Sequence, residues 1–135
     1  MSQPVVVVAY DGSAAAGRAL AYAADLAKPD GTVVVVNVIE VSGVGARLET
    51  VSAAERARQR QVLREARAVL SNRHVAVRVV PAAGDVYAEV LAAAAESDAD
   101  VIVSGRGKHD ARHPLHRPLG LRLARGAGRD VFVAT

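Results

Sequence analysis

The sequence predicts a single α/β domain built on a doubly wound, five-stranded parallel sheet with helices on both faces. Uninterrupted β-branched runs at Val5–Val8, Val33–Val36 and Val101–Val103 are typical of strands covered on both sides. Segments of helical periodicity alternate with the strand segments, as in parallel α/β sheets. The length of 135 residues suits one domain, spanning 1–135, that buries a core without disulfides.

Two further segments complete the predicted sheet. Val75–Val79 alternates between apolar and other residues and carries Arg78, which indicates a strand at the edge. Val131–Thr135 is a fifth, short strand. Right-handed crossovers make the first three strands wind outward in one direction before the chain returns beside the first. The predicted strand order is therefore 3-2-1-4-5.

The first two helices have clear start signals. Ser13 is a candidate N-cap for an alanine-rich helix that stops at Pro29-Asp-Gly31. Ser52-Ala-Ala-Glu55 is a capping box for the second helix, which should end near Asn72. We expect its inward stripe to consist of Leu63, Ala66, Val69 and Leu70. Its arginines, interleaved with glutamates, are expected to form a solvated face; they include Arg56, Arg60, Arg64 and Arg67.

The last two helices are shorter. The third should begin after Gly84, with Asp85 at its positive end. Its inward residues are expected to be Val86, Val90, Leu91 and Ala94. A fourth is predicted over 119–125, ended by Gly126 and Gly128.

Composition narrows the class of protein. Cysteine is absent, so disulfides and thiolate metal sites are excluded. The amino terminus has no basic region before its apolar run, and Asp11 ends that run, which argues against a signal peptide or membrane span. We therefore expect a cytoplasmic protein. The net charge of +3 comes with four aromatic residues, three Tyr and one Phe, which argues against a nucleic-acid stacking platform.

Two strand ends carry the candidate site. Adjacent strands one and four form the switch point where open parallel sheets bind ligands beyond their carboxyl ends. Asp11 follows the first strand, and the fourth ends at Gly105-Arg106-Gly107, where exposed amides and a forked cation could hold phosphate. Val38, near the end of the second strand, could lie against a flat apolar group. Asp-Gly-Ser could equally be only a turn into a helix cap.

Other chemistry finds little support. The chain lacks a P-loop, the Gly-x-Gly-x-x-Gly fingerprint, paired carboxylates and a Ser/His/Asp arrangement, so no catalytic machinery is visible. His109, His113 and His116 lie with Asp110 in a segment that also contains Pro114 and several arginines, which argues against a dedicated metal site. A pH-sensitive surface loop is the favoured interpretation of this segment.

The chain resembles the universal stress protein family over nearly its whole length. The matching pieces are Val7-Val-Ala-Tyr-Asp-Gly-Ser13, Val35-Val-Asn-Val-Ile39, Gly84, Ala99-Asp-Val-Ile-Val103 and Val131-Phe-Val133. The resemblance implies a homodimer formed through the last strand. It also implies that the chain is either an ATP-holding member or one that has lost ATP. The adenosine-side positions Ala9, Asp11 and Val38 are intact, and Tyr10 lies between the first two.

The family's phosphate pattern is only partly kept. Nucleotide-holding members carry Gly-x-x-Gly, nine residues, then Gly-Ser or Gly-Thr. Here the positions read Ser104-Gly-Arg-Gly107, nine residues, then Arg117-Pro118, with Leu119 following. An alternative alignment places Gly120 against the later glycine. Replacing the family's Gly-Ser or Gly-Thr pair with Arg117-Pro118 removes a hydroxyl donor and one amide, while Arg117 adds charge.

Two functional hypotheses remain. In the first, the chain is a stress-response module that binds ATP, ADP or AMP, with or without Mg²⁺, between strands one and four. Its site would comprise Ala9, Tyr10, Asp11, Val38, Gly105, Arg106, Gly107, Arg117, Pro118 and Leu119. In the second, it has lost ATP and acts as a dimeric scaffold whose basic loop 106–117 faces an acidic protein partner. Weak nucleotide hydrolysis ranks last because no base is identifiable.

Overall fold

A computed structural model describes residues 3–41, 51–105 and 130–134 of the chain. The elements in chain order are β1 (Val5–Ala9), α1 (Ala14–Ala27), β2 (Thr32–Glu40), α2 (Ala53–Leu70), β3 (Ala76–Gly84), α3 (Val86–Glu96), β4 (Val101–Gly105) and β5 (Asp130–Ala134). The predicted fourth helix over 119–125 lies outside the described residues.

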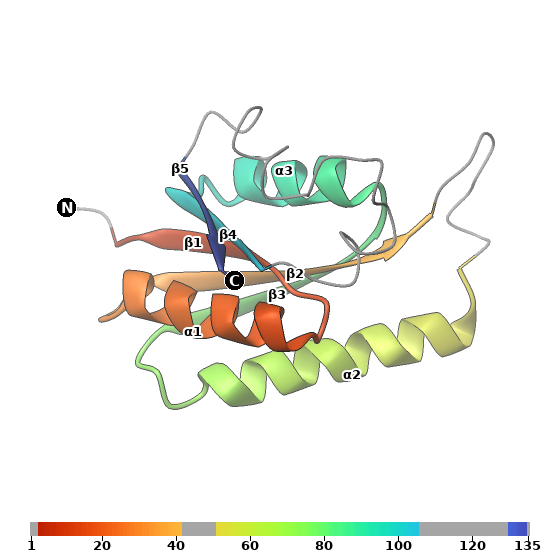
Figure 1. The fold of residues 1–135 in the computed structure, drawn as a ribbon, viewed down its shortest axis with the longest axis horizontal. Helices are drawn as coiled ribbons and strands as arrows, with labels where there is room; N and C mark the ends of the chain where they lie inside the picture. Colours follow the sequence, from red (N-terminus) through yellow and green to blue (C-terminus); the bar gives the residue numbers. More distant parts are fainter. Residues whose placement is uncertain (1–2, 42–50, 106–129, 135) are drawn as a thin grey trace.

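The five strands form one sheet in the order β3-β2-β1-β4-β5, and every neighbouring pair is parallel. The predicted fold class and strand order are therefore confirmed. In Figure 1, α1 and α2 lie on one face of this sheet and α3 on the other. Strands β1, β2 and β4 are internal, as their apolar runs predicted.

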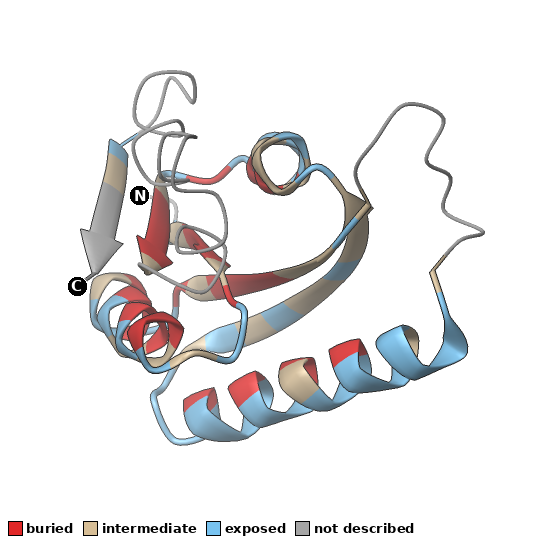
Figure 2. Ribbon diagram, turned by 45° about the vertical axis from the view of Figure 1, so that its right-hand side comes forward, coloured by how far each residue is buried: buried red, intermediate tan, exposed pale blue. Residues whose placement is uncertain are grey.

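Each face of the sheet has its own core, because successive strand residues point to opposite sides. Val6 and Val8 of β1 pack with α1 and α2, whereas Val7 packs with α3. The contribution of α1 to the first core is almost all alanine, including the fully buried Ala19 and Ala23. Such small side chains let the helix backbone lie close to the sheet. Figure 2 shows that the buried residues of α1 and α2 face inward.

The two predicted caps, at Ser13 and in the Ser52–Glu55 box, are present, and Asp85, expected only as a favourable charge at the start of the helix, is also an N-cap. Ser13 accepts a hydrogen bond from the Ala16 amide at the start of α1, and Asp85 caps α3 by accepting from Ala88. The capping box of α2 is complete, since Ser52 accepts from the Glu55 amide and Glu55 accepts from the Ser52 amide. Each cap satisfies donors that the first helical turn leaves without intrahelical partners.

The structure corrects two details. Val69 does not lie on the inward stripe of α2, because 48% of it is exposed; the buried residues are Gln59, Leu63, Ala66 and Leu70. β3 extends well past the predicted Val79 to Gly84 and includes Pro81. It can do so because it pairs along β2 as far as Glu40 while its other side is the sheet edge, where proline is tolerated.

Candidate functional site

The carboxyl ends of β1 and β4 lie side by side. Ala9 pairs with Ser104, and Ala9 also pairs with Val36 of β2 on its other side. Asp11 and Gly105 therefore follow neighbouring positions at the same end of the sheet. This is the juxtaposition expected at a switch point of an open parallel sheet.

Asp11 builds the turn between β1 and α1. Its Oδ1 accepts a hydrogen bond from the Ser13 amide at 2.9 Å, and Gly12 has a φ of +83°. Glycine is suited to that position because a side chain there would be strained. The carboxylate thus organises the entry to α1, and the Asp11 side chain is exposed at the strand end. Both the structural and the ligand-binding interpretations of Asp-Gly-Ser are compatible with this geometry.

Tyr10 points to the face of the sheet that carries α1 and α2. It is 8% exposed and belongs to the core cluster that contains Val6, Val8 and Leu63. Burial raises the pKa of its phenol, and the negative charges of Glu65 and Asp11 raise it further. Its amide donates to the carbonyl oxygen of Val36. The Tyr10 side chain is therefore directed into the core.

Ala9 and Val38 lie on the opposite face, beside α3. Both are half-buried and pack against the cluster that contains Val7 and Val36. Ser104 is paired with Ala9 and so shares its face; it is 1% exposed, and its hydroxyl donates to the Gly105 carbonyl at 3.2 Å. The structure thus brings together Ala9 and Val38, whereas the side chain of Tyr10 lies on the other side of the sheet.

Gly105 is a close-packing position. A Cβ built on it would stand 2.6 Å from the Ala15 carbonyl carbon and 2.8 Å from the Ala16 nitrogen. Real Cβ atoms essentially never approach backbone so closely. The absence of a side chain at this position therefore lets the end of β4 contact the first turn of α1, whether or not a ligand is present.

A buried polar network supports the same end of the sheet, and the sequence analysis missed it. Gln59 of α2 is 3% exposed, and its Nε2 donates to the carbonyl oxygens of Asn37 at 2.9 Å and Ala82 at 2.8 Å. The Asn37 side chain in turn donates to the Tyr10 carbonyl at 2.8 Å. Gln59 thus connects α2 to β2 and β3, and Asn37 extends the network to Tyr10, just after β1. The spacing of Gln59 to Leu63, Ala66 and Leu70 was the signal, because it places Gln59 on their stripe.

The remaining predicted site residues cannot be placed in the same way. Arg106, Gly107, Arg117, Pro118 and Leu119 lie outside the described residues, as do the three histidines of the 109–116 segment. Within residues 3–41, 51–105 and 130–134, no group of three metal-ligating side chains occurs. No helix among these residues is long and apolar enough to cross a membrane.

The sequence model of the universal stress protein family matches residues 4–125. The chain belongs to this family. The resemblance read from its motifs is therefore confirmed. No curated protein sequence matches the chain.

Solved structures of the family are similar over almost the whole chain. A universal stress family protein from Burkholderia pseudomallei is 29% identical, with a TM-score of 0.71 and coverage of 97% of this chain and 95% of that one. Universal stress protein UspA from Lactobacillus plantarum is 17% identical, with a TM-score of 0.81 and coverage of 100% and 99%. A universal stress protein solved in complex with cAMP is 21% identical, with a TM-score of 0.78 and coverage of 99% of each chain. At 17% and 21% identity, the similarity of the last two structures to this chain shows a shared fold and no more.

Proposed function

We propose that this universal stress family protein binds an adenine nucleotide at the carboxyl ends of β1 and β4. The observation that carries the proposal is the pairing of Ala9 with Ser104, which puts the exposed Asp11 beside the end of β4. Asp11 and Val38 would contact the adenosine part. Gly105, Arg106, Gly107 and Arg117 would contact the phosphates. A structural relative in complex with cAMP supports a ligand of this class.

The described residues fit the adenosine part of such a ligand. Asp11 offers an exposed carboxylate oxygen that can accept from a ribose hydroxyl or an amine. Ala9 is small, and Val38 is half-buried beside the same core cluster. The protein would act as a binding module rather than an enzyme, because no residue is positioned as a general base by the motifs of the sequence.

Calorimetry with ATP, ADP, AMP and cAMP, each with Mg²⁺, tests the proposal. Asp11→Asn keeps an acceptor for the Ser13 amide but removes the charge, whereas Asp11→Ala removes both. We expect binding to the unmodified protein, weaker binding to Asp11→Asn and the weakest to Asp11→Ala. Asp25→Asn, an exposed carboxylate on α1, is the matched control and should bind normally.

No heat with any nucleotide at millimolar concentration would overturn the proposal. It would favour instead a family member that works as a scaffold through the basic loop 106–117. The departures at Ser104, Arg117 and Pro118 from the family's phosphate pattern are what make this the second candidate. Mass spectrometry of small molecules released from the purified protein would identify any nucleotide that the protein retains.

We further propose that the protein is a homodimer joined through β5. This strand ends the sheet next to β4, so one of its backbone edges has no neighbouring strand among the residues that the structure describes. An unpaired strand edge is a template for pairing with another chain.

A further inference from the structure

One flank of α2 carries a stripe of arginines that form no ion pair with the helix's own glutamates. Arg56, Arg60, Arg64 and Arg67 follow one another at intervals of four, four and three residues. At about 100° per residue they lie within roughly 80° of the helix circumference. We call these four residues the arginine stripe. Such a stripe concentrates positive charge along one line of the surface.

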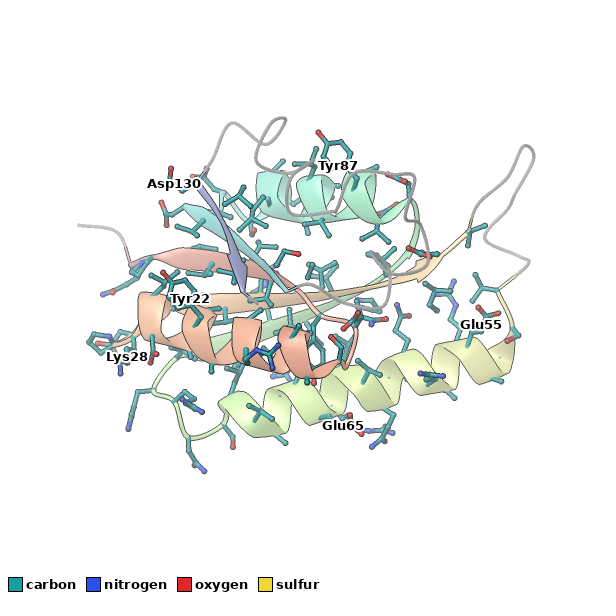
Figure 3. All side chains as sticks on the ribbon, in the orientation of Figure 1. Tyr22, Lys28, Glu55, Glu65, Tyr87 and Asp130 are labelled. Carbon is teal, nitrogen blue, oxygen red and sulfur yellow. The ribbon has the colours of Figure 1, made fainter. Side chains whose placement is uncertain are left out.

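The two acidic residues of α2 lie elsewhere. Glu55 is used in the capping box at the start of the helix, and Glu65 accepts a hydrogen bond from Gln61. Figure 3 labels both glutamates, at the beginning and in the second half of the helix. The ion pair of Lys28 with Asp25 lies at the end of α1 and involves none of these arginines. Arg64 donates to the neutral Gln61 side chain at 2.7 Å and Arg67 to the Val77 carbonyl at 3.4 Å, and none of the four arginines forms an ion pair with a described carboxylate. The stripe therefore keeps its positive charge, and an external anion would compete with these neutral acceptors.

The stripe runs along the open edge of the sheet. Arg67 donates to the Val77 carbonyl at 3.4 Å near the start of β3, and Gln59 donates to the Ala82 carbonyl near its end. These two contacts fix α2 antiparallel to β3. On the opposite flank of α2, Val62 lies close to Gly12, so that flank faces the start of α1. The arginine stripe consequently follows β3 on the side away from α1.

The edge strand itself offers backbone groups for pairing. The Ala76 amide donates to Gly31 and the Gly84 carbonyl accepts from Val41, so even-numbered residues direct their backbone toward β2. Odd-numbered residues, among them Val77 and Val79, then direct theirs outward, because strand residues alternate in this respect. Pro81, which has no amide to donate, occupies one of the outward positions. The long 3.4 Å contact of Arg67 is a weak bond that a better acceptor can displace.

We infer that the β3 edge and the arginine stripe together form a docking surface for an extended acidic peptide segment of a protein partner. Such a segment would pair with the outward backbone groups of Val77 and Val79. Its alternate side chains recur every 6.8 Å or so along a strand, close to the roughly 6 Å that four residues rise along a helix. Carboxylates on the α2 side of the added strand would therefore meet successive arginines. This mode is strand addition to a sheet edge, with charge selecting the partner.

Fluorescence anisotropy with a labelled peptide of alternating glutamate and threonine tests the inference, and the matching lysine and threonine peptide is the control probe. We expect only the acidic peptide to bind. The double variant Arg60→Gln/Arg64→Gln should weaken its binding about 5- to 30-fold, if each exposed charge pair contributes up to about 1 kcal/mol. Arg58→Gln/Lys28→Gln also removes two positive charges, from outside the stripe, and should leave binding within about twofold.

A second variant separates strand addition from general attraction of anions. Val79→Pro removes an amide that points outward and should abolish peptide binding while β3 stays paired with β2. Circular dichroism and thermal unfolding confirm that the variant is folded. Arg60→Gln/Arg64→Gln changes only exposed side chains, so it keeps the test valid if Val79→Pro does not fold.

Three results would overturn the inference. The first is no binding of the acidic peptide at 0.1 M salt, which would mean that the arginines only shield the edge from aggregation. The second is equal loss in both double variants, which would indicate attraction by overall charge. The third is binding of a single-stranded oligonucleotide as tightly as the peptide and unaffected by Val79→Pro, which would identify a polyanion surface instead.

Discussion

Gln59 is the buried polar side chain that joins α2 to β2 and β3. We expect Gln59→Leu to lower the free energy of unfolding by about 1–3 kcal/mol, because the carbonyls of Asn37 and Ala82 would each lose a donor in a buried site. Urea denaturation measures this difference. Gln61→Leu, on the exposed side of the same helix, is the matched control and should change stability by no more than about 0.5 kcal/mol. Equal effects of the two substitutions would contradict the network.

Tyr10 should make stability depend on pH in the alkaline range. Its pKa is raised from an ordinary value of 10.0, chiefly by burial, so the folded protein retains the phenol proton where the unfolded chain releases it. The stabilisation is complete below about pH 10 and is lost as pH rises from the unfolded pKa through the folded pKa. Tyr10→Phe should therefore flatten the fall in stability above pH 10. Urea denaturation at several pH values checks this.

A stability of Tyr10→Phe that falls above pH 10 as steeply as that of the unmodified protein would contradict the assignment of the buried phenol.

At the scale of elements, substitution of two glycines by alanine tests two different effects, close packing at Gly105 and helix propensity at Gly17. Gly105→Ala should destabilise the protein by about 1–3 kcal/mol, because the new Cβ would overlap the backbone of α1 and force it away from β4. Gly17→Ala, in the interior of α1 with nothing within 4 Å of the added Cβ, should instead stabilise by about 0.5–1 kcal/mol. Thermal unfolding of both variants checks the opposite signs. Stabilisation by Gly105→Ala would refute the close contact of β4 with α1.

The elements also show why some of the structure was predictable and some was not. Continuous apolar runs predicted the internal strands, and capping residues such as Ser13 and Ser52 predicted helix starts, because these signals are local. The prediction that Val69 lies on the inward stripe of α2 was wrong, and the burial of Gln59 on that stripe was missed. Both errors arose because hydrophobicity alone was used to assign residues to the inner or outer side of the helix. The position of Gln59 depends on strand carbonyls supplied by distant segments. The length of β3 likewise depends on pairing with β2 rather than on its own residues.

The candidate site, too, was only partly predictable from the sequence. Asp11, Ala9 and Gly105 could be located at adjacent strand ends because strand order follows from crossover handedness. The side of the sheet to which Tyr10 points required the structure. So did the role of Gly105, since its contact is with a helix backbone that no sequence motif reveals.

At the scale of the whole molecule, Val131→Asp tests the proposed dimer. Val131 is half-buried on β5, and a carboxylate there would have to be buried without a partner if a second copy covers the strand. We expect the variant to be monomeric by light scattering, with its fold checked by circular dichroism. Asp130→Asn, at an exposed position of the same strand, should keep the dimer. A folded Val131→Asp variant with unchanged mass would reject pairing through β5.

A nucleotide bound to this protein should contact the residues where β1 and β4 end together. The most direct test is a titration of ¹⁵N-labelled protein with ATP and Mg²⁺, followed by amide resonances. We predict saturable shifts at Asp11, Gly12 and Gly105, and none at Val77 and Val79 on the far edge of the sheet. Unchanged resonances at these three residues with millimolar ATP, or shifts confined to the β3 edge, would contradict a nucleotide site at this end of the sheet.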